Sequence, residues 1–185
     1  MPAALSAPEL ATILGLAAVA INTSWPLLRD RRRILMLQCA SATLFASHYA
    51  LLGALTASAM CFAGIVQGAS AVLIRNKATR LGVFGTTILG GFALTAATWS
   101  GVPSLCAQSG QMLSALGRLQ RSPQALRWCF LASEAFWVTH NALVGSRAGL
   151  TSDALATSML LLGLWLGRSA PGVVRLRQAG RAPAA

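Results

Sequence analysis

Acidic residues are almost absent from this chain. Among its 185 residues there are four, Glu9, Asp30, Glu134 and Asp153, and charged residues of both signs make up only 10% of the sequence. A soluble domain typically carries about 25% charged residues, so this composition excludes that class. Apolar residues take their place: 55% of the chain is hydrophobic and its mean hydropathy is +0.62.

The usual signatures of chemistry are also missing. The four cysteines, Cys39, Cys61, Cys106 and Cys129, lie within apolar segments, and no two form a CxxC pair or a Cys/His ligand spacing. We interpret them as small buried hydrophobic residues. Because no nucleophile–base pair, phosphate loop or metal cluster is visible, we expect no enzymatic activity, no cofactor and no metal. The N-terminus lacks the basic start and cleavage site of a secretory signal, so we expect its apolar run to be a retained helix.

What the chain has in excess is positive charge. Fifteen basic residues against four acidic ones give a net charge of +11, and such an excess can indicate nucleic-acid binding. Here the basic residues fall in short clusters between long apolar stretches, as they do in the cytoplasmic loops of membrane proteins. We therefore expect the chain to have a lipid bilayer, and no nucleic acid, as its partner.

The apolar stretches have the length of membrane spans. A hydrocarbon core about 30 Å thick needs about 20 helical residues, and seven segments qualify: 8–28, 34–53, 55–74, 81–99, 101–117, 128–146 and 150–168. Backbone polar groups in lipid must be satisfied internally, which requires helices. The sequence thus predicts an all-α integral membrane protein with seven transmembrane helices. We expect residues 1–185 to form a single membrane domain that ends in a flexible, basic cytoplasmic tail at 169–185.

The distribution of the basic residues predicts an orientation. They follow the first, third, fifth and seventh segments, while the alternate turns carry only Arg147. The positive-inside rule then places all four clusters in the cytoplasm. We expect a bacterial inner-membrane protein with a periplasmic N-terminus and a cytoplasmic C-terminus. The clusters are Arg29 with Arg31–Arg33, then Arg75, Lys77 and Arg80, then Arg118, Arg121 and Arg127, and finally Arg168, Arg175, Arg177 and Arg181.

An internal repeat relates the two halves. The stretch from Phe45 through His48-Tyr49 to Gly53 resembles the stretch from Trp137 through His140-Asn141 to Gly145, and its histidines and glycines are each 92 positions apart (140 − 48 and 145 − 53). Upstream, Asn22 aligns with Gln111, and Arg29 with Arg118, at an offset of 89.

The repeat predicts two three-helix units, 8–74 and 101–168, joined by a linker helix at 81–99. The linker helix makes the two units parallel, related by an axis along the membrane normal. Transporters built from such repeats carry a central site at the repeat interface.

Polar residues inside the predicted spans are the functional candidates, because ionisable groups are costly at membrane depth. Those expected to line a central solute site are Asn22, Gln38, Gln67, Gln108, Gln111, Glu134 and Asn141. His48, His140, Glu134 and Asp153 are candidates for proton coupling, with structural hydrogen bonding as the alternative. Pro26 is the candidate hinge, since proline permits a helix kink.

Each candidate also has a purely structural interpretation. Polar groups between membrane helices commonly form hydrogen bonds worth about 0.6 kcal/mol, the histidines lie where they can cap backbone or bind a neighbouring helix, and Asp153 is placed to be a helix N-cap. Glu134 lies deeper. We expect it to face the interior and to be neutral, beside Gln38 or Asn22, or paired with Arg118 or Arg127, because a bare buried carboxylate is very costly.

Several stretches resemble the bacterial YgjV-type inner-membrane proteins over nearly the full chain. The resemblance is carried by Asn22 with Arg29-Asp30-Arg31-Arg32-Arg33, by His48-Tyr49 with Leu51-Leu52-Gly53, and most specifically by Trp137-Val138-Thr139-His140-Asn141 with Gly145-Ser146. That family is similar to PQ-loop and SWEET-like proteins, so the resemblance implies a three-plus-one-plus-three helix plan.

The sequence departs from the SWEET-like pattern at the binding residues. SWEET-type transporters contact sugar through asparagines on the third and seventh helices, where this chain has Gln67 and Leu160-Leu161-Leu162. Trp25-Pro26 and Ser114-Ala115 stand where the Pro-Gln dipeptides are expected. The resemblance therefore supports the helix bundle more than it supports sugar binding.

Two functions remain open at the level of sequence. The first is a small-solute transporter or facilitator in which two three-helix units rock around a midplane polar site. The alternative is a non-transporting accessory or sensor protein whose arginine-rich cytoplasmic face binds anionic lipid or a partner. A continuous polar cavity favours the first and a tightly packed bundle the second. A homo-oligomer is compatible with either.

Overall fold

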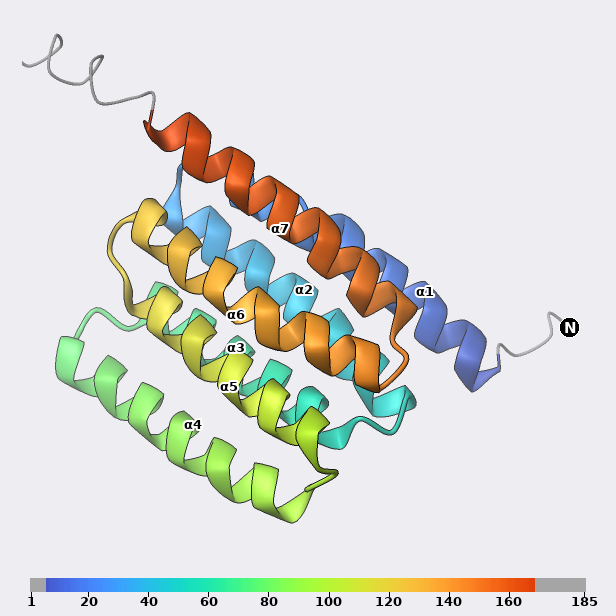
Figure 1. Ribbon diagram of the computed structural model, residues 1–185. Coiled ribbons are helices and arrows are strands. Elements are labelled where there is room, and N and C mark those ends of the chain that lie inside the picture. Colours follow the sequence, from blue (N-terminus) through green and yellow to red (C-terminus); the bar gives the residue numbers. More distant parts are fainter. Residues whose placement is uncertain (1–5, 169–185) are drawn as a thin grey trace, which may run out of the picture.

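The computed structural model describes residues 6–168, and in them the chain forms seven α-helices and one short 3₁₀ helix (Figure 1). The predicted tail at 169–185 lies outside the described residues. The elements are α1 (Ala7–Asn22), η1 (Trp25–Leu27), α2 (Arg31–Leu51), α3 (Leu55–Leu73), α4 (Lys77–Ala97), α5 (Val102–Leu119), α6 (Pro123–Leu143) and α7 (Arg147–Arg168).

Every predicted segment corresponds to a helix, but not every helix is strongly apolar. Five stretches are long and apolar enough to cross a membrane: Ala7–Leu27, Arg31–Leu51, Leu55–Leu73, Lys77–Ala97 and Arg147–Gly167. The other two helices, α5 and α6, are those with the largest share of buried polar side chains. That these two also cross the membrane stays a prediction, and their polarity has a structural reason given below.

Helices α2, α4 and α6 begin earlier than the hydropathy pattern predicts, because polar N-caps start them inside the basic clusters. The Asp30 side chain accepts hydrogen bonds from the backbone N–H groups of Arg32 (2.7 Å) and Arg33 (3.1 Å). Asn76 and Ser122 cap α4 and α6 in the same way. Such caps satisfy the free N–H groups of the first turn, so Arg31–Arg33 form the first turn of α2 instead of a loop.

The first predicted span differs most from the structure. The α1 helix ends at Asn22, and Trp25–Leu27 form a separate 3₁₀ turn with Pro26 in its first positions. The hinge hypothesis assumed that Pro26 kinks a continuous helix. Because α1 ends before Pro26, Pro26 does not do so. Since proline has no backbone N–H to offer, it fits best at a helix start.

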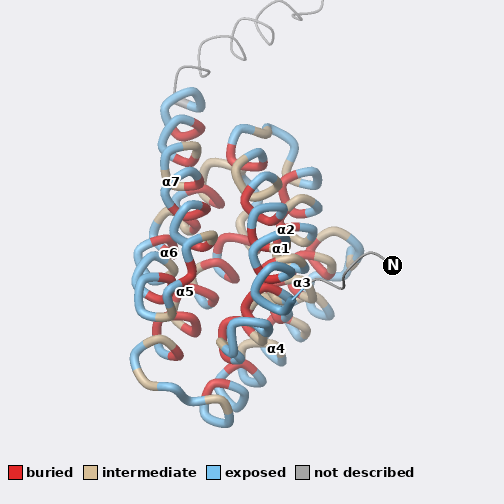
Figure 2. The backbone as a smooth tube through the Cα atoms, turned by 90° about the vertical axis from the view of Figure 1, so that its right-hand side faces the viewer, coloured by how far each residue is buried: buried red, intermediate tan, exposed pale blue. Residues whose placement is uncertain are grey.

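The helices pack as a ring of six with one helix outside it. Along the ring each helix contacts the next in the order α1, α2, α3, α5, α6, α7, and α7 closes the ring against α1. The α4 helix lies outside, against α3 and α5, and buries only Phe84, Gly91 and Thr95. Buried residues face the interior of the bundle and exposed residues its outer surface (Figure 2).

Successive helices run in opposite directions, so the connections alternate between two ends of the bundle (Figure 1). The α1–α2, α3–α4 and α5–α6 connections lie at the end where α7 finishes, together with the clusters around Arg32, Arg75 and Arg121. We call this the basic end. Arg147 begins α7 at the opposite end. The structure thus collects these three basic clusters at one end, as the charge pattern predicts.

Specific hydrogen bonds recur between the halves of the chain with an offset of 92 residues. His48 Nδ1 lies 2.7 Å from the Ala11 carbonyl oxygen, and His140 Nδ1 lies 2.9 Å from the Pro103 carbonyl oxygen. In each case a helix is bound to the helix that precedes it in the chain, α2 to α1 and α6 to α5. Both histidines therefore bind a neighbouring helix, the second of the two structural interpretations made from the sequence.

The turns after α2 and α6 repeat as well. Gly53 (φ +74°) and Gly145 (φ +68°) occupy the left-handed region, which glycine adopts at no steric cost. The following residue then donates back to the helix, from Ala54 N to Tyr49 O (2.9 Å) and from Ser146 N to Asn141 O (3.0 Å). This is the bond of a Schellman C-cap.

The same offset extends into the first helix of each unit. The Ser41 hydroxyl lies 3.5 Å from Asn22 Oδ1, and the Ser133 hydroxyl lies 3.0 Å from the Ser114 hydroxyl. Asn22 therefore corresponds to Ser114 (114 − 22 = 92) and not to Gln111, which corrects the alignment at offset 89. The hydrogen bonds keep the offset of 92 back to Asn22, whereas the alignment by residue type changed the offset from 92 to 89.

Candidate functional site

A cavity of about 90 Å³ lies inside the six-helix ring. Its lining comes from α1, η1, α2, α3, α5, α6 and α7, and none of it from α4. The polar lining residues are Asn22, Gln38, Ser41, Gln111, Ser114, Arg118, Ser133, Glu134, Ser152 and Asp153, and the aromatic ones are Trp25, Phe45, Tyr49, Phe130 and Trp137. A single water needs roughly 10–15 Å³ of such space, so the cavity has room for several waters or one small solute.

Five of the candidate residues line this cavity: Asn22, Gln38, Gln111, Glu134 and Asp153. They come from five different helices, so the fold brings together residues separated by up to 131 positions (153 − 22). Glu134 is buried and lines the cavity, in keeping with the prediction that it faces the interior. The polarity of α5 and α6 has its reason here, because these helices supply five of the ten polar lining residues.

The remaining candidates do not line the cavity. Gln67 donates to the Thr87 hydroxyl (2.9 Å) and accepts from Gln111 (3.1 Å), so it supports a lining residue from behind. Gln108 accepts from the Thr95 hydroxyl (3.0 Å) and joins α5 to α4. For Gln108 the geometry fits helix–helix hydrogen bonding, the structural alternative. His48 and His140 bind neighbouring helices, as described above.

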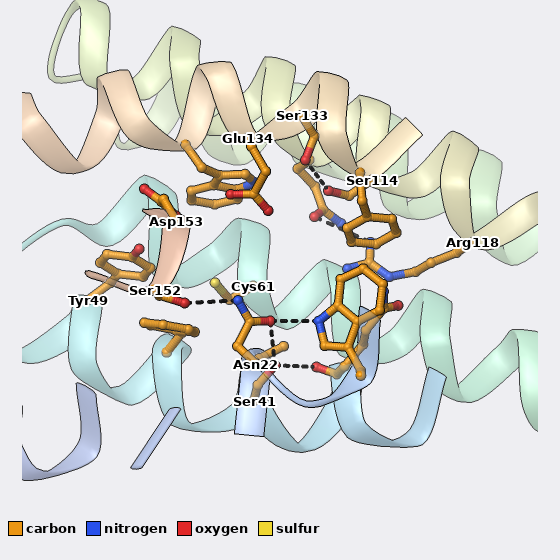
Figure 3. A pocket seen from close by; sticks show the side chains of 17 residues that line it. Asn22, Ser41, Tyr49, Cys61, Ser114, Arg118, Ser133, Glu134, Ser152 and Asp153 are labelled. Carbon is orange, nitrogen blue, oxygen red and sulfur yellow. Dashed lines mark hydrogen bonds between the residues drawn. The ribbon is translucent and has the colours of Figure 1, made fainter. Parts of the chain in front are cut away.

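Asn22 is held in the cavity wall by three neighbours. Its Nδ2 donates to the Ser152 hydroxyl (2.9 Å) on α7, and its Oδ1 accepts from Trp25 Nε1 (2.9 Å) and the Ser41 hydroxyl (3.5 Å). These bonds join α1, η1, α2 and α7 at one point (Figure 3). An amide that is hydrogen-bonded on both sides by other side chains is fixed in orientation. Asn22 is therefore a fixed part of the cavity wall.

Gln38 is the opposite case. It is only 4% exposed, and neither its Nε2 nor its Oε1 has a hydrogen-bond partner within the described part of the chain. Buried polar groups in proteins nearly always find a partner in protein or ordered water, and each exception needs an explanation. Gln38 also lines the cavity, so this unpaired donor and acceptor belong to the cavity wall.

Arg118 lines the cavity itself, although the sequence suggested it only as a basic loop residue and as a possible partner of Glu134. The charge pattern assigned it to a cytoplasmic cluster, yet it is only 6% exposed and lines the cavity. Its Nη1 donates to the amide oxygens of Gln67 (3.2 Å) and Gln111 (3.5 Å), its guanidinium lies 5.3 Å from the centre of the Phe130 ring, and its Nε has no partner. The signal was present in the helical spacing, since Ser104, Gln108, Gln111 and Arg118 fall on one stripe of α5.

The acidic side of the cavity is organised by Asn141. Its Oδ1 accepts from the Tyr49 hydroxyl (2.8 Å), and its Nδ2 donates to Asp153 Oδ2 (2.8 Å). Tyr49 and Asn141 are also separated by the offset of 92 (141 − 49 = 92) that relates the other repeated hydrogen bonds. Asp153 lies six residues inside α7, which begins at Arg147. It is therefore not an N-cap.

The basic partners considered for Glu134 bind elsewhere. Arg127 donates to the carbonyl oxygens of Pro26 (2.7 Å) and Leu28 (2.6 Å), which fixes the η1 segment. Arg118 bonds to neutral amides, as above. Within the described part of the chain, neither Glu134 nor Asp153 forms an ion pair, and no group of three or more His, Cys, Asp or Glu residues there could hold a metal ion.

Comparison with known proteins agrees with the membrane interpretation. Residues 9–169 match the family model Imp-YgjV, described as bacterial inner membrane protein. The chain belongs to this family. It is therefore an inner-membrane protein, in keeping with its apolar helices. No curated protein and no solved structure shows significant similarity to it.

Proposed function

We propose that this Imp-YgjV family protein is a carrier for a small polar solute and that the central cavity is its binding site. The observation that carries the proposal is the Gln38 amide, which is buried in the cavity wall with its donor and acceptor both unused. A bundle whose polar groups only held helices together would pair them with each other, as Gln108 and Thr95 are paired.

The position of the cavity supports the same function. It lies where two sets of three helices meet, and the repeated hydrogen bonds of His48 and His140 make each set a unit of similar construction. Carriers with repeated units bind solute at the repeat interface and alternate between two openings by moving one unit against the other. We propose the three-plus-one-plus-three plan of PQ-loop and SWEET-like proteins for this chain, with α4 as the linker helix.

We further propose that Glu134 and Asp153 hold one proton between them and couple its movement to the solute. Two buried carboxylates without a cation repel each other, and a shared proton removes that repulsion. Both residues line the cavity, so a bound solute lies next to the carboxyl groups that hold the proton.

The alternative of a lipid-binding accessory protein is supported by the basic end, where charges suited to anionic headgroups gather. That charge distribution equally fits the positive-inside rule for any inner-membrane protein. The polar cavity has no role in the accessory protein, and for that reason we favour the carrier.

Uptake into proteoliposomes tests the proposal. Purified protein is reconstituted and the entry of labelled glycine, 4-aminobutyrate, glycerol and urea is measured against protein-free liposomes. We expect entry of at least one solute, reduced to background by Gln38→Leu. The matched control is Gln120→Leu, since the Gln120 side chain bonds the Leu116 carbonyl oxygen outside the cavity (3.1 Å). Entry that is unchanged in Gln38→Leu would contradict a site at this cavity.

A further inference from the structure

The cavity carries charges of opposite sign at its two sides. Arg118 lies on one side and Asp153 on the other, with Glu134 between them (Figure 3). The positions of Arg118 and Asp153 along their helices agree with this separation. Helices α5 and α7 begin at the same end of the bundle, and Arg118 is sixteen residues into α5 (118 − 102) whereas Asp153 is six residues into α7 (153 − 147). At 1.5 Å per residue their Cα atoms are about 15 Å apart along the bundle axis.

The Arg118 side is rich in hydrogen-bond donors. The Arg118 guanidinium donates from Nη1 to neutral amide oxygens. Its Nε and the Gln38 amide have no hydrogen-bond partner among the described residues. Guanidinium groups bind carboxylates through two parallel N–H···O bonds. A positive charge buried in a membrane protein without a counter-ion is costly, so an anionic group on the solute would satisfy both the charge and the unused donors.

The opposite side suits a cation. Glu134 and Asp153 supply carboxyl oxygens, and the stacked rings of Tyr49 and Trp137, with centroids 6.1 Å apart, lie beside them. Ammonium groups are attracted both to carboxylates and to the faces of aromatic rings. Asp153 accepts from the neutral Asn141 amide, which brings no positive charge to the two acids.

We propose that the cavity recognises a small zwitterion, with its anionic group on Arg118 and Gln38 and its ammonium group on Glu134 and Asp153. The proposal rests on the carrier function above, because it names the class of solute that the same site takes. A sugar or another neutral polyol would leave the charges at both sides without partners. A simple anion or a simple amine would satisfy one side only.

Binding to the purified protein in nanodiscs, measured by calorimetry without any turnover, tests the proposal separately from transport. The zwitterions are glycine, β-alanine, 4-aminobutyrate and 6-aminohexanoate, a series in which the two charges move progressively apart. The matched compounds are propionate, propylammonium and propionamide. We expect one member of the zwitterion series to bind at least tenfold more tightly than all three matched compounds. Equal affinity of propionamide, or binding by none of the zwitterions, would overturn the proposal.

Two variants then locate the ends of the solute. Gln38→Leu should weaken the zwitterion about 10- to 100-fold, the effect of one hydrogen bond to a charged group at about 1.5–3 kcal/mol, and should leave propylammonium binding unchanged. Glu134→Gln should weaken propylammonium and spare propionate. Since the Gln38 side chain makes no hydrogen bond within the described residues, its replacement removes none, and a thermal unfolding scan checks the fold. Loss of both propionate and propylammonium in Gln38→Leu would contradict the assignment.

The outcomes separate the two proposals. Zwitterion binding without uptake into proteoliposomes would support the zwitterion site and contradict the carrier function. Uptake of glycerol or urea, with no zwitterion bound, would retain the carrier and reject the solute class.

Discussion

At the scale of single residues, the cavity depends on a few polar side chains that the rest of the bundle holds in place but does not neutralise. Gln38 has no partner, and Arg118 and the acids Glu134 and Asp153 lack counter-ions in the described residues. Other polar groups of the cavity wall, such as Asn22, are bonded on both sides. This contrast is the reason why we propose Gln38, Arg118 and the two acids as the functional groups.

Glu134→Gln should abolish the pH dependence of uptake while the protein stays folded. The amide has the shape of the protonated acid but cannot release a proton, so coupling stops at that residue. Uptake by the wild type and the variant is compared across the pH range in which both remain folded. Glu9→Gln is the control, because Glu9 is an exposed acid in α1. If Glu134→Gln keeps the pH profile of the wild type, Glu134 is not part of the coupling.

The repeat explains one unpartnered nitrogen and predicts how to give it a partner. His48 Nε2 lies 2.9 Å from the Ser146 hydroxyl, whereas His140 Nε2 is buried with none. The counterpart of Ser146 is Ala54 (146 − 54 = 92), which has no hydroxyl. We therefore expect Ala54→Ser to raise the free energy of unfolding by about 0.5–1.5 kcal/mol, the net worth of a hydrogen bond.

The reciprocal change should act in the opposite direction. Ser146→Ala leaves His48 Nε2 buried without its partner, and an unsatisfied buried group costs about 1–3 kcal/mol. Unfolding of both variants in detergent micelles gives the comparison. A destabilising Ala54→Ser would mean that the two units are not equivalent at this turn.

At the scale of the helices, small residues make room for the polar side chains. A methyl group at Gly64 of α3 would lie 3.0 Å from Arg118 Nη2, and one at Gly149 of α7 would overlap the Asn141 amide. Glycine at such positions lets membrane helices approach closely. Glycines therefore lie opposite these two large polar groups, and their lack of a side chain leaves the space that Arg118 and Asn141 occupy.

Gly149→Ala should destabilise the protein by about 1–3 kcal/mol, the usual cost of overpacking, and should weaken zwitterion binding because it displaces Asn141 from Asp153. Gly90→Ala in α4 is the matched control. A methyl group there meets no atom within 4 Å, so the change should be neutral or stabilising, as alanine favours a helix over glycine by about 1 kcal/mol. Equal effects of the two substitutions on unfolding would show that the contact at Gly149 is not as described.

The helix scale also shows how much the sequence could predict. The helical character of the apolar segments follows from hydropathy, because lipid leaves the backbone of a membrane span no other way to satisfy its polar groups. The stripes on α2 and α6 correctly marked Gln38 and Glu134 as buried. Periodicity gives the face of a helix but not the neighbour that the face meets, so Gln108, which contacts α4, was grouped with residues that line the cavity.

Arg118 was missed for a different reason. Counting arginines to find the cytoplasmic side treats each one as a loop residue, and Arg118 lies one residue before the end of α5. Its burial depends on Gly64, Gln67 and Phe130, which come from α3 and α6. The stripe that Arg118 shares with Gln108 and Gln111 gives the face of α5 on which it lies, but not these neighbours.

At the scale of the whole molecule, the orientation proposed from the positive-inside rule is testable with one pair of exposed arginines. Arg32 lies at the basic end and Arg147 at the opposite end. In intact cells, a membrane-impermeant thiol reagent should label Arg147→Cys and not Arg32→Cys, since we place the basic end in the cytoplasm. The reverse labelling pattern would invert the topology.

The most direct test of the carrier is whether the cavity opens to both sides of the membrane. Cys61 of α3 lines the cavity, so a variant that keeps only this cysteine, with Cys39, Cys106 and Cys129 changed to alanine, reports its exposure. Cys39, whose thiol lies 3.7 Å from the Ile65 carbonyl oxygen outside the cavity, serves as the control when it alone is kept. A membrane-impermeant, positively charged methanethiosulfonate reagent is applied to right-side-out and to inverted vesicles. We expect Cys61 to react in both preparations and Cys39 in neither; reaction of Cys61 from one side only, or from none, would contradict alternating access through this cavity.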